Sequence, residues 1–459
     1  MLTANPLEQL DLDVFAARLR AGEISSEAAT AAYLARIAAL DARLGAFVHV
    51  AGDAALDVAR GVDCLLRGGT DLGPLMGVPV VVKDLFTVAG MPLPRVGSDL
   101  DVHDLIEPEG TFVKALKRAG CVILGTARMT EFAFGLVNLR HRTPWNPRDA
   151  REHRMPGGSS SGSAVALAAG LCAFAAGSDT GGSVRHPAAL CGLFGFKPTA
   201  GLWPTDGVFP LSSTFDSIGT FTRSAHDAAQ VFAALTARPR PAPRALAGLR
   251  LGRPRHAPFD DLADDVSRAV DAALEHLRRA GVEIVAVDVP EAAEVDTVFL
   301  PMVPAELLAH LGADRIAAQK DVLDPMVQQR FEPATHQPAD RYIALRDRQR
   351  ALCRIAQARM QGLDGWVTAT SPDTAVRIAD FDTVDTASAW VRRGLRNTRP
   401  ANLFGQCAVS IPLPSTGGAL PVGLQVICGA GGDAALLSIA QGIENLLGRA
   451  PHADVSAFA

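Results

Sequence analysis

Two loops rich in serine and glycine constrain the fold of this chain more than any other feature. They lie in the segment 155–199, where the first loop, 157–162, reads Gly-Gly-Ser-Ser-Ser-Gly and the second, 178–183, reads Ser-Asp-Thr-Gly-Gly-Ser. Flexible Ser/Gly linkers are not followed by apolar helix and strand patterns. Here both loops border an Ala- and Leu-rich stretch, so we interpret them as parts of a compact core.

The residues between the two loops predict one helix and one strand. Small residues from Ser163 to Ala169 favour a helix, and Gly170 can end it as a left-handed cap. The apolar run 171–176 predicts a short buried strand. These two elements would hold the two loops at a defined distance from each other.

The second loop can bind an anion or a developing oxyanion. Glycine lets the backbone approach another group closely, so residues 180–183 can direct several N–H groups into one small concavity. Ser183 ends this nest with a hydroxyl group. A nucleophile beside an oxyanion hole is the minimum equipment for acyl transfer.

The segment resembles the signature of the amidase signature family. Gly157–Ala164 matches the family's Gly-Gly-Ser-Ser-Gly-Gly-Ser-Ala except at Ser161, and Asp179–Arg185 matches its Asp-Thr-Gly-Gly-Ser-(Ile/Val)-Arg. The strand that ends in Lys-Pro-Thr matches Phe194–Thr199. The resemblance is strong over about 75–221 and weaker toward the C-terminus. It implies one α/β domain around a large twisted sheet.

The resemblance also implies a mechanism that needs no cofactor. Ser183 would be the nucleophile, Lys83 the general base, and Ser159 the bridge between them. The backbone N–H groups of Thr180, Gly181, Gly182 and Ser183 would hold the oxyanion. A cis peptide between Gly158 and Ser159 would aim Ser159 inward, while Ser160 and Ser161 would support the loop or start the next helix.

Lys83 also stands out without the resemblance. It directly follows the apolar run Val78–Val82, and the chain holds five lysines against 39 arginines. A lysine at a strand end can also extend to solvent. An unperturbed lysine has a pKa of about 10.4. Burial disfavours the ammonium and would lower that pKa toward the range that a base needs.

The substrate-binding residues are less defined by the sequence. By resemblance, the region of Met129 and Phe132 borders the substrate pocket. Arg185 could hold a substrate carboxylate, or it could pair with Asp179 to brace the loop, which we favour. We interpret His186 as a packing or pocket-lining residue. The polar segment 321–340 is a candidate loop over the active site, with surface decoration as the alternative.

Three other functions are consistent with parts of the sequence. Residues 158–162 match Gly-x-Ser-x-Gly, the nucleophile elbow of α/β-hydrolases, with Ser160 as nucleophile, but residues 153–157 are a poor strand and the elbow must follow one. The family also includes the A subunit of tRNA-dependent amidotransferases, which works only with a partner chain. The third function, a non-catalytic binding protein on the same fold, is disfavoured by the intact Lys83, Ser159 and Ser183.

Composition limits the partners. A net charge of -5 with no charge block argues against nucleic acid, and no apolar run reaches membrane-spanning length. Seven scattered cysteines without Cys-x-x-Cys favour free thiols in a reducing, cytoplasmic setting. The N-terminal residues do not read as a secretory signal, and no His-Glu-x-x-His predicts a metal site. The oligomeric state, a homodimer included, stays open.

The chain is expected to form one α/β domain over residues 1–459, with a mixed, mostly parallel sheet covered by helices on both faces. Its parts are an N-terminal helical region (1–65), a catalytic core (75–221) and a more variable substrate-side region (250–400). The expected substrates are small aliphatic or aryl amides. Carbamates (urethanes) and esters present a similar carbonyl and stay open.

Overall fold

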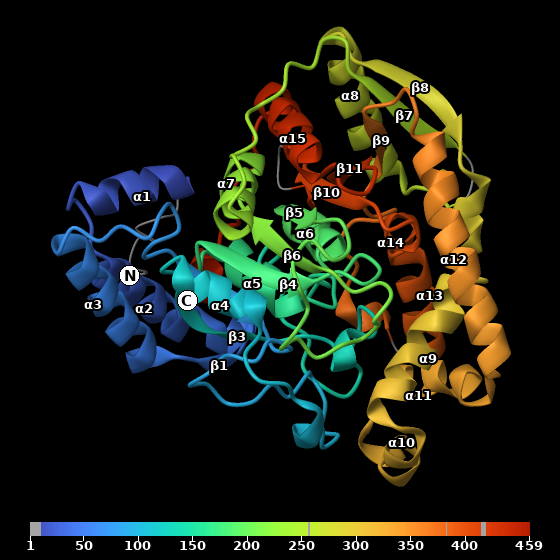
Figure 1. Ribbon diagram of the computed structural model, residues 1–459, viewed down its shortest axis with the longest axis horizontal. Helices are drawn as coiled ribbons and strands as arrows, with labels where there is room; N and C mark the ends of the chain where they lie inside the picture. Colours follow the sequence, from blue (N-terminus) through green and yellow to red (C-terminus); the bar gives the residue numbers. More distant parts are fainter. Residues whose placement is uncertain (1–10, 256–257, 382, 415–418) are drawn as a thin grey trace.

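A mixed sheet of eleven strands runs through the centre of the computed structural model, which describes residues 11–255, 258–381, 383–414 and 419–459 (Figure 1). In sheet order the strands are β1 (Phe47–Val50), β3 (Val122–Ala127), β2 (Pro79–Lys83), β4 (Phe174–Ser178), β6 (Ile218–Thr222), β5 (Phe194–Lys197), β10 (Cys407–Pro412), β11 (Gly423–Cys428), β9 (Gly365–Ala369), β7 (Arg250–Arg255) and β8 (Glu283–Asp288).

The sheet contains two parallel groups joined by antiparallel strands. Strands β3, β2 and β4 are parallel, and so are β9, β7 and β8. Every pairing from β4 through β6, β5, β10 and β11 to β9 is antiparallel, as is β1 with β3. The predicted mixed sheet is confirmed, with more antiparallel pairings than we expected. The short connection between β10 and β11 explains part of this, because parallel strands need a longer crossover.

Helices cover both faces of the sheet, as predicted. Neighbouring residues of β5 point to opposite faces: a Cβ on Gly195 would touch Ala188 of α6 (Arg185–Cys191), whereas the Phe196 ring packs against Phe232 of α7 (Ala225–Thr236). Helix α5 (Ser161–Ala168) lies beside α6, and α15 (Asp433–Leu447) lies beside α7. Both faces of the central strands are therefore buried, and all residues of β2, β4, β5 and β6 are buried.

The remaining helices form two groups at the ends of the sheet (Figure 1). The N-terminal group lies near β1 and β3 and contains α1 (Leu12–Arg20), α2 (Ser26–Leu44), α3 (Gly52–Arg67) and α4 (Thr111–Arg118). The second group follows β7 in sequence and contains α8 (Asp264–Arg279), α9 (Phe299–Leu311), α10 (Ala313–Ala318), α11 (Pro325–Phe331), α12 (Ala339–Arg359), α13 (Val384–Gly394) and α14 (Arg399–Leu403).

Most predicted elements lie where their patterns place them. Gly170 ends α5 with a φ of 69°, as predicted for a left-handed cap. The strand predicted at 171–176 begins only at Phe174, because residues 171–173 form a bend. The segment 321–340 is largely helical rather than a loop, since α11 and a short 3-10 helix occupy it. Within the described residues, no helix has the length and apolar character required to span a bilayer.

Candidate active site

Two predicted residues, Lys83 and Ser159, come together at the carboxyl ends of β2 and β4. The two strands are parallel neighbours, so their last residues, Lys83 and Ser178, lie at the same edge of the sheet. Ser159 approaches this edge from the loop before α5, and the Gly158–Ser159 peptide bond is cis, as the resemblance implied. The two Ser/Gly loops touch there, because the N–H of Ser160 donates to the carbonyl of Ser183 at 3.4 Å.

The Lys83 ammonium is fully buried and is held by hydroxyl groups. Its Nζ lies 2.7 Å from Ser159 Oγ and 2.9 Å from Ser178 Oγ. Burial lowers the pKa of Lys83 to about 7, although the nearby carboxylates of Asp216 and Asp179 oppose this shift. A substantial fraction of Lys83 is therefore neutral near pH 7, which a general base requires.

Ser183 lies on the wall of a cavity. It belongs to the connection between β4 and α6, and its side chain lines a cavity of about 460 Å³ together with Thr180 and Gly181. Within the described part of the chain, the N–H groups of Thr180, Gly181 and Ser183 make no hydrogen bond. Three donors beside one hydroxyl can stabilise an oxyanion.

The N–H group of Gly182 is not a free donor, in contrast to the predicted nest of four donors. Its N–H donates to Asp179 Oδ1 at 2.8 Å, and Gly182 does not line the cavity. The prediction of Gly182 as an oxyanion donor is therefore corrected, because its hydrogen is already used. A glycine is still required at position 182 for the conformation of the loop. Its φ is 128°, and a Cβ there would lie 2.1 Å from Thr398 Oγ1.

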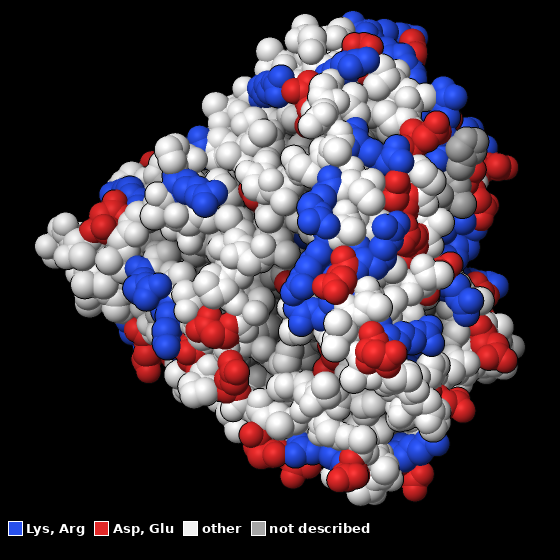
Figure 2. All heavy atoms as spheres, turned by 45° about the vertical axis from the view of Figure 1, so that its right-hand side comes forward, with Lys and Arg blue, Asp and Glu red and all other residues white. Residues whose placement is uncertain are grey.

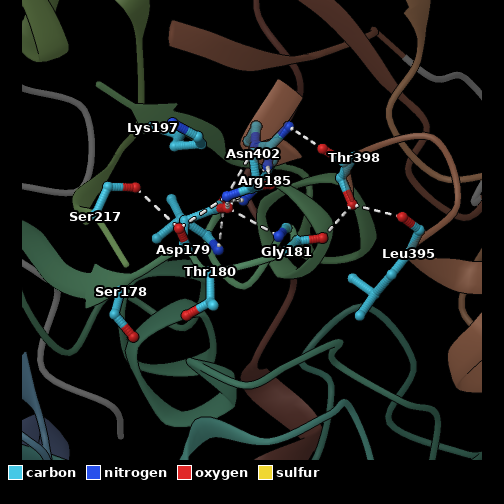
Figure 3. A network of polar contacts seen from close by, with 12 residues as sticks. Ser178, Asp179, Thr180, Gly181, Arg185, Lys197, Ser217, Leu395, Thr398 and Asn402 are labelled. Carbon is cyan, nitrogen blue, oxygen red and sulfur yellow. Dashed lines mark hydrogen bonds and ion pairs between the residues drawn. The ribbon is translucent and has the colours of Figure 1, made fainter. Parts of the chain in front are cut away.

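A buried ion pair shapes the loop that carries Ser183 (Figure 3). The Asp179 carboxylate accepts the N–H groups of Gly182, Val184 and Arg185, and it also accepts the Arg185 guanidinium at 2.8 and 3.0 Å. Burial alone would raise the pKa of Asp179, but the Arg185 charge outweighs it and holds that pKa well below its usual range. Asp179 is thus an anion that organises the loop from inside.

Arg185 is a brace and does not bind substrate. Its guanidinium also donates to Asn402 Oδ1, Gln425 Oε1 and the Thr398 carbonyl, and its side chain is fully buried away from the cavity. The substrate-binding role predicted for Arg185 is corrected, and the pairing with Asp179 that we favoured is confirmed.

Residues from the C-terminal region support the same loop. Thr398 Oγ1 donates to the carbonyl of Gly181 at 2.7 Å, and the Asn402 amide donates to the carbonyl of Asp179 at 3.0 Å. These two residues were not identified from the sequence, because nothing in their local sequence marks them as neighbours of a loop more than 200 positions away.

Two further residues of the site were missed. Ser178 bonds Lys83, and its place directly before the Asp-Thr-Gly-Gly-Ser loop was the available signal. Asp216 receives the Thr180 hydroxyl at 2.5 Å and the N–H groups of Leu211 and Ser212. Burial raises the pKa of Asp216 to about 6.

Met129 and Phe132 do not reach the cavity. Both are buried, and the Phe132 ring stacks on Phe209 in the core. Their predicted role in substrate binding is corrected, because the chain turns at Phe132, where φ is 51°, and the next residues, Ala133 to Gly135, line the cavity instead. The segment 321–340 does border the cavity, through residues of α11 and the turn after it.

Ser160 and His186 have packing roles. Ser160 is fully buried, donates to the Ser178 carbonyl at 3.3 Å and does not line the cavity. No strand occurs in 153–157, so the nucleophile elbow with Ser160 lacks its required support. Burial lowers the pKa of His186 to about 3, and the ring packs against Trp390 with centroids 5.6 Å apart.

Potential metal ligands lie elsewhere. Among the described residues, one group of three has suitable spacing, namely Asp11, Asp13 and His226 at the surface near α1 and α7. Asp11 pairs with Arg449, and Asp13 pairs with His226. The group includes no residue of the candidate site. All seven cysteines are free thiols.

Comparison with known proteins gives matches to a family model, to curated relatives and to solved structures. The family model described as Amidase matches residues 28–437. A 2-amino-5-chloromuconic acid deaminase of Comamonas testosteroni is 38% identical over 96% of both chains. The A subunit of the glutamyl-tRNA(Gln) amidotransferase of Aromatoleum aromaticum is 34% identical over 92% of this chain and 94% of the relative. The native peptide amidase of Stenotrophomonas maltophilia superposes with a TM-score of 0.82, at 30% identity, over 98% of this chain and 99% of that chain.

Proposed function

Because the chain belongs to the amidase signature family and is therefore an enzyme that hydrolyses C–N bonds, we propose that it cleaves small amides through an acyl-enzyme on Ser183. The observation that carries this proposal is the fully buried Lys83 Nζ, 2.7 Å from Ser159 Oγ, at the edge of the cavity-lining Ser183 loop. The peptide amidase and the deaminase among its relatives support the same reaction class.

In the first half-reaction, neutral Lys83 accepts the Ser159 proton while Ser159 takes the proton of Ser183. The freed Ser183 oxygen attacks the amide carbonyl, and a tetrahedral intermediate forms. The N–H groups of Thr180, Gly181 and Ser183 stabilise its oxyanion. The proton then returns through Ser159 to the leaving nitrogen, the C–N bond breaks, and ammonia or an amine departs.

The second half-reaction uses the same groups. Water gives its proton through Ser159 to Lys83 and attacks the acyl carbon. When the new intermediate collapses, the Ser183 oxygen leaves and recovers a proton, so the carboxylic acid is released and the enzyme returns to its starting state. One hydroxyl that passes protons in both directions explains why Ser159 bonds Lys83.

The test combines activity with active-site labelling. Purified enzyme is assayed against primary amides, anilides, carbamates and esters, and it is labelled with a serine-directed phosphonate. Ser183→Ala is expected to lower turnover on the order of a million-fold, as in other serine hydrolases, and to abolish labelling. A Ser183→Ala enzyme that kept a tenth of the wild-type rate would contradict the assignment.

Ser159→Ala is expected to cause a comparable loss. Ser161→Ala is the matched control, because within the part of the chain that the structure describes its hydroxyl reaches only the Arg128 carbonyl, at 3.5 Å. The same substrate panel decides whether carbamates and esters are cleaved, since they present a similar carbonyl to the same oxyanion donors. Equal losses in both variants would remove Ser159 from the relay.

A second candidate function is that of the A subunit in a tRNA-dependent amidotransferase. The 34% identity to such a protein over more than nine-tenths of both chains favours it. In that role the site would release ammonia for use by a partner chain. Co-purification of a second chain and amide cleavage that depends on tRNA would support it, whereas full amidase activity of the isolated chain would favour a free-standing enzyme.

A further inference from the structure

The cavity beside Ser183 is strongly positive. Four arginines line it, Arg330, Arg341, Arg392 and Arg399, and among the described lining residues none is Asp or Glu. The chain as a whole carries an excess of acidic residues, with 49 against 44 basic ones. Figure 2 shows Lys and Arg side chains gathered beside a hollow in the middle of the face that it presents. The cavity therefore carries an excess of positive charge, although the chain as a whole is acidic.

Arg399 is the deepest of the four. Only 7% of it is exposed, and its Nε, which is buried, has no hydrogen-bond partner within the described residues. Among the described residues, the one hydrogen bond of its guanidinium runs from Nη1 to the Arg392 carbonyl at 3.5 Å. Burial, and then repulsion from Arg330, lowers the pKa of Arg399 to about 9, so the side chain is still a cation at neutral pH.

Arg330 reaches the cavity from α11. Its guanidinium lies over the Phe134 ring, 5.1 Å from the centroid, and donates to the Phe134 carbonyl. No described carboxylate lies within 4 Å of the guanidinium of Arg330 or Arg399, and the carboxylate that raises the pKa of Arg399, that of Asp296, is exposed. The carboxylate that raises the pKa of Arg330 is that of Asp324. It already accepts hydrogen bonds from the N–H groups of Leu139, Arg140 and Met326. A buried charge without a partner is costly, so an anion from outside would stabilise this arrangement.

Arg399 lies beside the loop that carries Ser183. A Cβ on Gly181 would lie 3.4 Å from Arg399 Cγ and 3.0 Å from the Phe299 ring. The Arg399 side chain therefore packs directly against the loop that carries the proposed oxyanion donors. An anionic group bound by Arg399 and Arg330 would belong to the same small molecule whose amide carbonyl lies at Ser183.

We propose that Arg399 and Arg330, with Arg392 nearby, bind a carboxylate of the substrate, so that the enzyme acts on small amides that also carry a carboxylate. This inference rests on the proposed amidase function and specifies its substrate class. Planar guanidinium groups match a carboxylate bidentately. The apolar residues around them, such as Phe299 and Val303, accommodate a short carbon chain between the carboxylate and the amide.

The first experiment compares two matched substrates of the wild-type enzyme. They are the 4-nitroanilides of butanoic acid and of butanedioic acid, which have the same acyl length and differ in a terminal methyl or carboxylate. A charge-assisted hydrogen bond contributes about 1.5–3 kcal/mol, which corresponds to a ratio of roughly 10- to 150-fold. We expect kcat/KM for the acidic anilide to exceed that for the neutral one by this factor.

The second experiment changes the arginines. Arg399→Gln and Arg330→Gln are each expected to lower the acidic-to-neutral kcat/KM ratio about 10-fold or more. The ratio cancels any general loss of active protein. Arg354→Gln is the control, because this exposed arginine of α12 lies outside the cavity, and its ratio should equal that of wild type. Arg330→Gln keeps the test valid if Arg399→Gln does not fold.

A binding measurement separates the two proposals. Butanedioate is titrated calorimetrically into Ser183→Ala, and into the same variant with Arg399→Gln or Arg330→Gln. Binding to the first protein and its loss in the others would support the carboxylate site even if neither anilide were cleaved, whereas the amidase proposal is decided by the full substrate panel. Hydrolysis with equal rates for both anilides, or binding unaffected by the arginine variants, would overturn the carboxylate site.

Discussion

At the scale of single residues, the protonation of Lys83 decides whether the site can work. Its amine is fully buried, two hydroxyls contact it, and burial lowers its pKa to about 7. A lysine that served only as a fixed cation would benefit from a higher pKa. The observed environment instead favours the neutral amine, which is the form that accepts a proton.

Lys83→Arg is expected to be as damaging as Lys83→Ala. Arginine retains the positive charge but does not lose its proton in proteins, so it cannot act as a base. The measurement is kcat/KM of both variants on the neutral 4-nitroanilide of butanoic acid, with circular dichroism as the control for folding. Near-normal activity of the arginine variant would exclude Lys83 as the base.

The pH dependence of activity should follow Lys83. Below its pKa the lysine is protonated and inactive as a base, so kcat/KM is expected to rise with pH, with a midpoint at about pH 7. The Asp216 carboxylate raises the pKa of Lys83, and Asp216→Asn should therefore move the midpoint to lower pH. A flat or falling profile between pH 5.5 and 8.5 with the neutral anilide would contradict this expectation.

At the scale of elements, the connection between β4 and α6 is built around the Asp179–Arg185 pair. Asp179 holds the backbone of Gly182, Val184 and Arg185, and within the described residues the N–H groups of Thr180, Gly181 and Ser183 are left without a hydrogen bond. The same carboxylate therefore determines both the shape of the loop and the number of its free donors.

Arg185→Met is expected to lower the free energy of unfolding by about 3–5 kcal/mol, because it leaves a buried carboxylate without its partner. The measurement is chemical denaturation, and the double variant Asp179→Asn/Arg185→Met should lose less stability than Arg185→Met alone. Arg60→Met is the control, since its pairs with Glu27 and Asp57 are exposed and should matter little. Unchanged stability of Arg185→Met would show that the pair is not a brace.

At the scale of the whole molecule, distant parts of the chain meet at one loop. Lys83 and Ser159 come from the N-terminal half, whereas Thr398, Asn402 and Gln425 come from the C-terminal half and contact residues 179–185.

Buried carboxyl groups occur throughout the molecule. Burial raises the pKa of five of them to about 6 or 7, namely Asp84, Glu131, Asp216, Asp227 and Glu444.

These carboxyls predict that stability falls as pH rises from about 4.5 to 7. In that range the folded state binds more protons than the unfolded state, so raising the pH favours unfolding. Glu444→Gln should make the loss of unfolding free energy between pH 4.5 and 7 smaller by up to about 3 kcal/mol. The measurement is denaturant unfolding at a series of pH values. Glu275→Gln, at an exposed position of α8, is the control, and identical slopes for both variants would contradict the prediction.

The sequence by itself determined the features that depend on neighbouring residues. The apolar run before Lys83 predicted a buried strand with a lysine at its end, and the structure contains both. The N-terminal region 1–65 was predicted to be helical, and its described part contains α1, α2 and α3, with the Ser25 side chain accepting the Ala28 N–H at the start of α2. The resemblance of 157–164 implied the cis peptide before Ser159. Such features are local, because helix caps and strand patterns are set within a few residues.

Only the tertiary structure decided which groups face the cavity. The N–H of Gly182 points to Asp179, and Arg185 contacts residues more than 200 positions away. Phe132 turns into the core at a positive φ, while Arg399 and Arg330 reach the cavity from α14 and α11. The physical reason is that the direction of a side chain relative to a cavity depends on long-range packing, which the pattern of adjacent residues does not encode.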